Sequence, residues 1–468
     1  MKKIIPVIYV VFLWAAWYFC YRHYLIWLEG FSFFSNIPDF TEIHLLLPQE
    51  LFRYVGAFLL QFYAHPVAGA AIQAVMPVIS ALCIWAVLKR MFKDADGLMW
   101  IAFLPVPFMV SCQMSDMTLL RSVAILSAVS LLLMAVFLVT AVFGKPLTRL
   151  PGFLRNRYLS LVMLLVSLIA SISIITRYGS LSGYHEQVAR LEYLGEQGEW
   201  DRILEEVSYQ DAMKNEYCRK YALLALSQTG RLPDYAFRYG LSSSQDFLFQ
   251  GQQEPFCLGF NVLFYRSIGM NNPAVYNSYQ QAVQSLPGLS FDVVRGLADI
   301  YLEQKDYTLA KKYMDILSHS TCHGRWLRER IPMLESIKDS EPEYKCSGEP
   351  FVMESFLPDI SSMVDRNKYN QKFADYLLCG VLADKDGNAF YNIFNIIAMT
   401  LYPNGKNIPR LYQEALLLIA SKEPSLLDRY VIDEEVWKRF TDFTEMMSKG
   451  KVAQAKRKYA DTYWSYIY

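Results

Sequence analysis

Three acidic residues near the N-terminus, Asp39, Glu42 and Glu50, lie in a polar stretch between two apolar runs. We expect this stretch to be the first loop outside the cytoplasm. Membrane glycosyltransferases that use lipid-phosphate sugars have an essential carboxylate in such a loop, so these acids carry the strongest enzymatic hypothesis. However, the acids lack the spacing of metal ligands, and such enzymes generally have more membrane spans than this chain. The alternative is an ordinary polar loop.

A second group of reactive side chains is His319, Cys322 and His323. Thiol and imidazole groups suit zinc or haem iron. A haem-attachment motif would need a cysteine where His319 stands, and the only further zinc ligand on offer is the distant Cys346. We therefore interpret this segment as a turn at the end of a helix rather than as a metal site.

A third pattern, formed by Asp384, Asp386 and Asn388, matches the beginning of a calcium-binding loop. The glycine of such a loop should follow Asn388, but Ala389 does, and the twelfth position is Asn395 instead of glutamate. A solvated turn between helices explains these residues better. The chain also contains no Gly-x-Ser-x-Gly, His-Glu-x-x-His, P-loop or Gly-x-Gly-x-x-Gly motif. We therefore expect no cofactor, no bound metal and no catalytic residue of a known motif.

The elements that carry these residues change in composition at about residue 176. Residues 1–176 contain long uncharged apolar runs, whereas most of the 45 Lys+Arg and 45 Asp+Glu residues follow them. A helix needs about 20 apolar residues to cross a bilayer. The sequence therefore predicts a transmembrane helical bundle with spans at 4–28, 67–88, 98–115, 122–143 and 158–176. Pro105 and Pro107 should kink or shorten the third span.

Two apolar segments of this region each allow two interpretations. The first run begins with Lys2 and Lys3, as a signal peptide would, but no small-x-small cleavage site follows it. A retained anchor is therefore favoured over a cleaved signal. The segment 51–64 is apolar but short, and a crossing there would move the basic loop after the second span outside the cytoplasm. A re-entrant or interfacial helix is therefore favoured over a further span.

Basic residues in the short loops predict the orientation of the bundle. With five spans, one side receives Lys2, Lys3, Lys89, Arg90, Lys93, Lys145, Arg149, Arg155 and Arg157. The other side receives Arg53, Arg121 and Arg177. Because positively charged loops face the cytoplasm, we expect a multi-pass protein of a bacterial inner membrane. Its N-terminus would be cytoplasmic and its C-terminal domain periplasmic.

The chain after residue 176 shows short helical patterns and no sustained period-2 runs, so we expect an all-α fold. Turn positions recur at Gly198, Gly230, Gly269 and Lys305, with spacings close to the tetratricopeptide (TPR) period of about 34 residues. The sequence therefore predicts TPR-like helical repeats, an α-solenoid, over 177–338. An irregular helical bundle is the alternative.

The clearest repeat copy covers residues 294–317. Two helices that cross closely need small residues at the crossing, and bulky residues beside them fill the space between repeats. The repeat-packing positions that we expect are Leu297, Ala298, Tyr301, Tyr307, Ala310 and Met314. Stacked repeats of this type present a concave groove, which is a binding surface and not a catalytic pocket.

Beyond the repeats, residues 339–367 contain Pro342, Pro350 and Pro358 and are expected to form a loop. Residues 368–468 should form a C-terminal helical region. The eight cysteines include no Cys-x-x-Cys pair, which argues against a disulfide framework; the sequence leaves open one disulfide between Cys322 and Cys346.

Three stretches together resemble a family of uncharacterised membrane proteins from Bacteroides-type bacteria. They are residues 47–71 (LPQELFRYVGAFLLQFYAHPVAGAA), 409–420 (PRLYQEALLLIA) and 459–468 (YADTYWSYIY). The resemblance covers most of the chain and implies a membrane region followed by a TPR-like region, but no activity. Family members commonly have Pro-Gly-Gly where this chain has Pro48-Gln49-Glu50, which puts in doubt any role tied to those glycines.

These observations favour a membrane protein that presents a TPR-like helical domain to an unknown protein or peptide, which would bind in the repeat groove. The other partner that we expect is membrane lipid. The formal net charge is +0, and the part after residue 176 is slightly acidic, so nucleic-acid binding is not expected. The alternative is a membrane-embedded enzyme of envelope glycan or lipid assembly that uses Asp39, Glu42 and Glu50.

Overall fold

The computed structural model describes most of the chain, and the elements of secondary structure in the described part are helices. The described residues are 4–45, 48–92, 97–114, 133–138, 156–181, 183–252, 254–284, 288–343, 355–366, 370–421, 425 and 428–468. None of them lies in a β-strand. The all-α fold class expected from the sequence is therefore confirmed.

The chain divides into two compact units. Unit 1 comprises Met1–Arg190 and Ser285–Pro342, and unit 2 comprises Leu191–Gln284 and Glu343–Tyr468. Ser285–Pro342, the last part of the expected solenoid, is thus grouped with the apolar N-terminal region. The domain boundaries expected from composition, at residues 176, 338 and 367, stay predictions.

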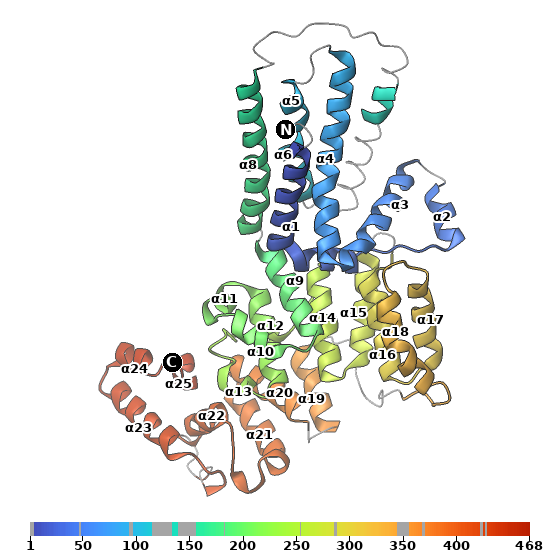
Figure 1. Ribbon diagram of the computed structural model, residues 1–468. Coiled ribbons are helices and arrows are strands. Elements are labelled where there is room, and N and C mark those ends of the chain that lie inside the picture. Colours follow the sequence, from blue (N-terminus) through green and yellow to red (C-terminus); the bar gives the residue numbers. More distant parts are fainter. Residues whose placement is uncertain are drawn as a thin grey trace. The chain divides into compact units, whose positions relative to one another are not determined.

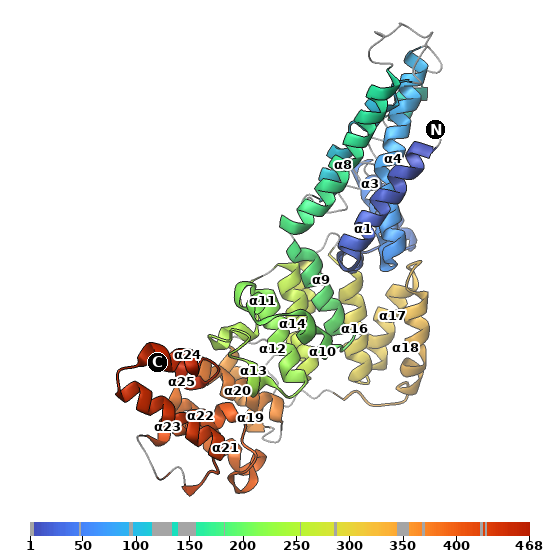
Figure 2. The same ribbon diagram turned by 60° about the vertical axis from the view of Figure 1, so that its left-hand side comes forward.

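Long apolar helices form the core of unit 1. They are α1 (Ile4–Gly30), α4 (Pro66–Met91) and α8 (Arg157–Leu181). Among the described residues, Ile4–Gly30, Pro66–Lys89 and Tyr158–Arg177 are long and apolar enough to cross a membrane, which agrees with three of the five expected spans. Figures 1 and 2 show the helices side by side, with the end of α4 and the beginning of α8 at one end of the bundle.

The other apolar segments of unit 1 form shorter helices. The expected span 98–115 is broken into α5 (Met99–Phe103) and α6 (Val106–Met114), which follows from the proline at position 105. The expected span 122–143 lies outside the described residues except for 133–138, which are helical. The segment 51–64 falls in α3 (Pro48–Leu60) and the 3-10 helix η1 (Gln61–Ala64).

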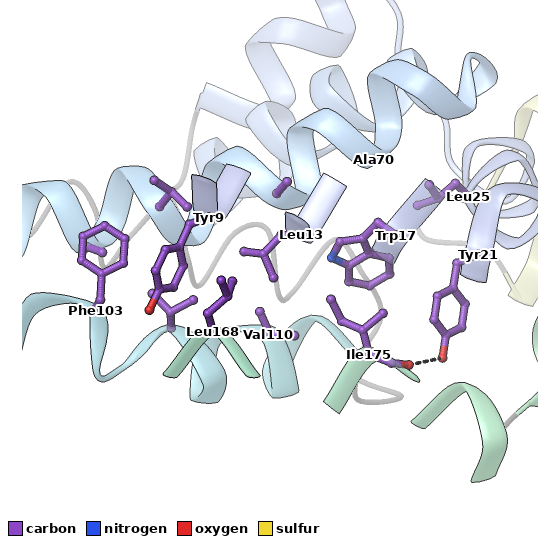
Figure 3. Close-up of a cluster of buried hydrophobic side chains, with 14 of the residues drawn as sticks. Tyr9, Leu13, Trp17, Tyr21, Leu25, Ala70, Phe103, Val110, Leu168 and Ile175 are labelled. Carbon is purple, nitrogen blue, oxygen red and sulfur yellow. Dashed lines mark hydrogen bonds between the residues drawn. The ribbon is translucent and has the colours of Figure 1, made fainter. Parts of the chain in front are cut away.

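A stripe of side chains on α1 forms the centre of the bundle. Tyr9, Leu13, Trp17, Tyr21 and Leu25 recur at every fourth position and are all buried (Figure 3). Positions four apart share one face of a helix, so this face packs against α4, α5, α6 and α8. The Tyr21 hydroxyl donates to a backbone carbonyl of α8 at 3.1 Å, which satisfies a polar group that hydrocarbon could not.

A carboxylate from outside the spans caps a break in α1. Tyr21 has non-helical backbone angles, φ −141° and ψ 24°, so the following N–H groups lose their helical acceptors. The N–H groups of His23 and Tyr24 donate to the Glu186 carboxylate at 3.1 and 2.8 Å, and His23 Nδ1 lies 2.6 Å from it. Glu186 therefore acts as an N-cap for the last part of α1.

The remaining helices of unit 1 follow the chain into Ser285–Pro342. They are α2 (Pro38–Leu45), α16 (Phe291–Glu303), α17 (Tyr307–Ser318) and α18 (Gly324–Ser336). Backbone hydrogen bonds connect the segment after α1 to this part: Phe291 N donates to Ser32 O at 2.8 Å, and Asn36 N to His319 O at 2.9 Å. The α16–α18 segment is therefore anchored at the C-terminal end of α1.

Unit 2 consists of short helices. They are α10 (Trp200–Glu206), α11 (Tyr209–Lys214), α12 (Glu216–Gln228), α13 (Leu232–Tyr235), η4 (Ser244–Phe247), α14 (Pro255–Ile268), α15 (Asn271–Gln284), α19 (Phe356–Arg366), α20 (Gln371–Ala383), α21 (Gly387–Leu401), η5 (Pro403–Gly405), α22 (Arg410–Ala420), α23 (Glu434–Ser448), α24 (Val452–Lys458) and α25 (Tyr463–Ile467). The helix α9 (Gly183–Glu196) belongs partly to each unit. Side chains cap several of them; Asn215, for example, accepts from two N–H groups of α12.

The helix α19 occupies part of the range expected to be a loop. Its residues Phe356, Ile360 and Val364 are buried at every fourth position. Pro358 lies in its first turn, where the missing N–H has no helical acceptor. Three prolines in this range indicated a loop, but a proline at this place starts a helix as readily as it ends one.

The turns that suggested repeats share one backbone conformation. Gly198, Gly230, Gly269 and Lys305 all have positive φ, between 55° and 79°. At each, the N–H of the next residue donates to the carbonyl five positions earlier, at 2.8 to 2.9 Å. This is the Schellman arrangement, which ends a helix and lets the chain reverse. The turn after α20, at Lys385, has it too, although its sequence did not reveal it. The turns therefore share one conformation, whereas the stacking of helix pairs into a solenoid stays a prediction.

Candidate functional site: a pocket beside the C-terminal segment

The acids of the enzymatic hypothesis lie on α2 and α3. Asp39 and Glu42 are exposed on α2, and Glu50 is in the first turn of α3, where its side chain lies outside the described part of the structure. Within the residues that the structure describes, no group of three or more His, Cys, Asp or Glu side chains could hold a metal ion. Catalysis by these acids stays a prediction.

The structure gives His323 electrostatic partners instead of metal co-ligands. Its Nε2 lies 2.9 Å from Glu29 Oε1 and 3.3 Å from Arg295 Nη1, and its Nδ1 lies 2.7 Å from the Ser320 hydroxyl. A guanidinium at this distance disfavours a bound cation. Cys346 lies outside the described residues, so its disulfide with Cys322 stays a prediction.

Glu29 forms the centre of a buried charge cluster in unit 1 that the sequence did not reveal. Its side chain is fully buried, and Arg295 Nη2 donates to Glu29 Oε2 at 3.1 Å. Arg295 also pairs with Asp292, and burial raises the pKa of the Asp292 carboxyl. A Cβ added to Gly30 would clash with the Asp292 carboxylate. A buried charge is tolerated only when it is paired with an opposite charge. Because Arg295 of α16 pairs with Glu29 of α1, this cluster holds α16 against the end of α1.

The segment with calcium-loop character acts as a helix connection. Asp386 Oδ1 accepts from Ala389 N at 2.8 Å and so caps α21. The Asp384 carboxylate accepts from the Ser243 hydroxyl at 2.9 Å and from the Ser244 hydroxyl at 2.6 Å. These contacts agree with the turn that we expected here.

The expected repeat-packing positions lie on the helix pair α16 and α17. Leu297, Ala298, Ala310 and Met314 are buried, and Tyr301 and Tyr307 are partly buried. The Tyr301 ring stacks on Tyr313, at 5.7 Å between ring centroids. The small residues thus lie in the interior of unit 1, although a role in repeat packing stays a prediction.

Two of the three stretches that carry the family resemblance contact each other in unit 2. The helix α22 holds the C-terminal segment 459–468, and Figure 2 shows α25 beside α22. Glu414 of α22 accepts from Tyr463 N at 2.7 Å, and Trp464 Nε1 donates to the Glu414 carbonyl at 2.9 Å. Arg410 donates to Asp461 at 3.0 Å. The residues of these two stretches are therefore used to attach the end of the chain.

The acids of this attachment are already neutralised. Arg410 Nε donates to Glu414 Oε1 at 2.8 Å, and Arg439 donates to Asp461 at 2.6 Å. Burial raises the pKa of Glu414, and the bonds from Tyr463 N and Arg410 offset part of that rise. For Asp461, the bonds from Arg439 and Arg410 outweigh burial and lower its pKa. Each of these carboxylates is therefore paired with at least one guanidinium.

A pocket of about 430 Å³ lies between this segment and the helices α11, α13 and α22. Pockets that bind ligands have roughly this size. Its apolar lining consists of Tyr209, Met213, Pro233, Phe237, Leu411, Tyr463 and Tyr466. Phe237 contacts the rings of Tyr463 and Tyr466, at centroid distances of 5.5 and 4.8 Å. The aromatic side chains thus hold one another in place.

Two charged residues at the rim of the pocket differ from the neutralised acids. Asp234 and Arg238 are both exposed, and among the described residues neither forms an ion pair or a side-chain hydrogen bond. The Arg238 guanidinium lies over the Tyr209 ring at 4.6 Å, so it is positioned without an acid. The pocket walls raise the pKa of Asp234 by partial burial, an effect that Arg410 opposes. Both groups are available to a ligand.

A buried carboxyl group in the same unit, that of Asp375, has no cationic side chain paired with it among the described residues. Tyr412 Oη and Gln371 Nε2 both donate to Asp375 Oδ1 at 2.8 Å. Gln371 also donates to the Tyr402 hydroxyl at 2.8 Å. Burial raises the pKa of Asp375 to about 7. Asp375 therefore titrates near neutrality in the folded protein.

Comparison with known families supports the resemblance. A family model described as a family of unknown function (DUF6057) matches residues 1–176 and 151–468. The chain belongs to this family. The expected membership in a family without assigned activity is thus confirmed, whereas an origin in Bacteroides-type bacteria stays a prediction. No curated protein and no solved structure matches the chain.

Sequence reasoning missed Asp234, Arg238 and Glu29. Only Glu29 carried a signal, as an acid directly after a long apolar run. Asp234 and Arg238 are ordinary surface charges in the sequence, and only the pocket beside them distinguishes them.

Proposed function

We propose that this protein is anchored in the membrane by its apolar helices and uses residues 177–468 to bind a segment of another protein. The observation that carries the proposal is the pocket in unit 2, with an apolar lining and two charged residues, Asp234 and Arg238, that form no ion pair with other described residues. Protein interfaces combine a buried apolar centre with a polar rim in this way. Binding and not catalysis is the work that such a site supports.

The membrane part of the proposal rests on three helices long and apolar enough to span a bilayer. Outward-facing side chains on them are apolar and exposed, including Val7, Val11 and Phe12 on α1 and Leu165 and Ile169 on α8. Such a surface suits lipid and not water. We infer that the protein is a multi-pass protein of an inner membrane.

The orientation that we propose places residues 177–468 outside the cytoplasm. The end of α4, with Lys89, and the beginning of α8, with Arg157, lie at the same end of the bundle. The positive-inside rule assigns that end to the cytoplasm. The C-terminal end of α8 then faces the periplasm.

The experiment that tests this function is mild crosslinking of the tagged full-length protein in native membranes, followed by gentle extraction and mass spectrometry. We expect a reproducible protein partner that is lost when residues 177–468 are removed. Since a truncated chain can misfold, the Lys438→Glu variant, which changes an exposed charge on α23, serves as a folded control. A bound polyprenyl lipid or glycolipid without a protein partner would overturn the proposal.

A further inference from the structure

The pocket in unit 2 contains enough detail to define the chemistry of its occupant, and this inference rests on the proposed function. Asp234 and Arg238 are four positions apart, across α13 and the turn after it. Residues four apart on a helical turn lie roughly 6 Å apart at Cβ. The rim therefore offers one negative and one positive group close together, on the same side of the pocket.

The groups of opposite sign limit the kind of ligand. An inorganic anion would meet Arg238, but it would also meet the Asp234 carboxylate, which repels it. A ligand with both an acid and a base satisfies the two rim groups together.

The interior of the pocket favours an apolar group between those two charges. Met213 is 62% exposed and Tyr209 37% exposed, so apolar surface is open to a partner at this place. Leu411 and Pro233 are buried behind them. Burying an apolar side chain of a partner here would favour binding.

We propose that this pocket binds a protein segment with an apolar side chain between an acidic and a basic residue. The acid of the segment pairs with Arg238 and its base with Asp234, while the apolar side chain contacts Met213 and Phe237. The Tyr209 ring holds the Arg238 guanidinium ready for the acid. Because Asp234 and Arg238 form no ion pair with other described residues, binding of the segment does not have to break an existing ion pair.

Site-specific photocrosslinking in the full-length protein tests this pairing. A photoreactive amino acid replaces Met213 in the pocket, and in a second protein it replaces Met399, which is 79% exposed on α21. We expect a protein adduct from position 213 that position 399 does not give. The crosslinked peptide should contain an acid and a base on either side of an apolar residue. An adduct of lipid or glycan, or a peptide without this pattern, overturns the proposal.

Charge exchange then tests the contacts one by one. A synthetic peptide of the crosslinked segment is titrated onto the full-length protein in detergent. Arg238→Glu and Asp234→Lys should each weaken binding about tenfold or more, whereas Lys438→Glu should leave it unchanged. Reversing the acid of the peptide to lysine should restore binding to Arg238→Glu.

The outcomes separate this inference from the proposed function. If the partner binds with equal affinity to Arg238→Glu, Asp234→Lys and the unchanged protein, the pocket is not its site, although the function stands. If no partner depends on residues 177–468, the function itself fails. Circular dichroism of each variant confirms that the helices are retained, so that a loss of binding reports the contact.

Discussion

At the scale of single residues, the chain stabilises its buried polar groups in different ways according to their charge. Lys220 is 1% exposed, and its Nζ donates to the carbonyls of Gln245 and Leu248 at 2.9 Å. Burial lowers the pKa of Lys220. Glu29 is buried with Arg295 and His323 beside it. Asp375, by contrast, accepts hydrogen bonds from the neutral side chains of Gln371 and Tyr412, and burial raises its pKa to about 7.

Replacing Asp375 with asparagine should remove a pH dependence of stability. The folded pKa is about 7, above the value of about 3.9 in an unfolded chain. The folded state therefore holds this proton more tightly, so stability falls as pH rises from about 4 to about 7 and is then level. At neutral pH, Asp375→Asn should be more stable than the unchanged protein, by at most about 4 kcal/mol.

The measurement is denaturant unfolding of the full-length protein in detergent at several pH values between 4 and 8. The control is Asp365→Asn, which changes an exposed acid on α19. Parallel stability curves for Asp375→Asn and the unchanged protein would show that Asp375 stays ionised in the folded state.

At the scale of elements, the C-terminal segment is the clearest example of a short helix that depends on its neighbours. The helix α25 has only 5 residues, too few to form alone in water. Its Trp464 is buried with Phe443 and Tyr459. Tyr466 Oη lies 2.9 Å from both the Ser242 and the Ala383 carbonyl oxygens and can donate its single hydrogen to either. Packing, and not helix propensity, therefore determines the position of the C-terminal segment. This segment forms one wall of the pocket.

Replacing Trp464 with alanine should destabilise unit 2 by roughly 3–5 kcal/mol, because it removes a large buried side chain together with its hydrogen bond to the Glu414 carbonyl. Met399→Ala, at an exposed position, should change stability little. Limited proteolysis should release the C-terminal segment from Trp464→Ala first. Equal resistance in the two variants would mean that the segment is attached by other contacts.

At the scale of the whole molecule, the question is which side of the membrane each part of the chain occupies. The apolar helices of unit 1 are long enough to cross a bilayer, whereas the side of the membrane on which unit 2 lies stays a prediction. Of the basic residues that predict the orientation, Arg53, Lys89, Arg90, Arg157 and Arg177 lie in helices, and the others are outside the described residues. The sequence remains the main support for the orientation.

Reporter fusions should settle the orientation. We expect fusions after residues 93 and 145 to be active in the cytoplasm, and a fusion after residue 468 to be active only outside it, since basic loops remain inside. A pair of reporters, one active on each side, provides the internal control at every site. A cytoplasmic C-terminus would imply a different number of crossings and would contradict the periplasmic assignment.

The sequence by itself determined the features that depend on neighbours along the chain. Apolar length predicted the spans at α1, α4 and α8, and turn residues predicted the helix ends at Gly198, Gly230 and Gly269, because hydropathy and backbone preference act locally. Family resemblance followed from short stretches, one of which, 459–468, proved to be attached to another, 409–420.

Only the tertiary structure decided which distant residues meet. Glu29 and Arg295 are 266 positions apart, and Arg410 and Asp461 are 51 apart. No local preference encodes such pairs, since each forms only when whole helices pack. The same holds for the pocket, whose walls come from α11, α13, α22 and the end of the chain. Asp234 and Arg238 become a candidate site only because packing places apolar surface beside them and leaves both charges without a partner among the described residues.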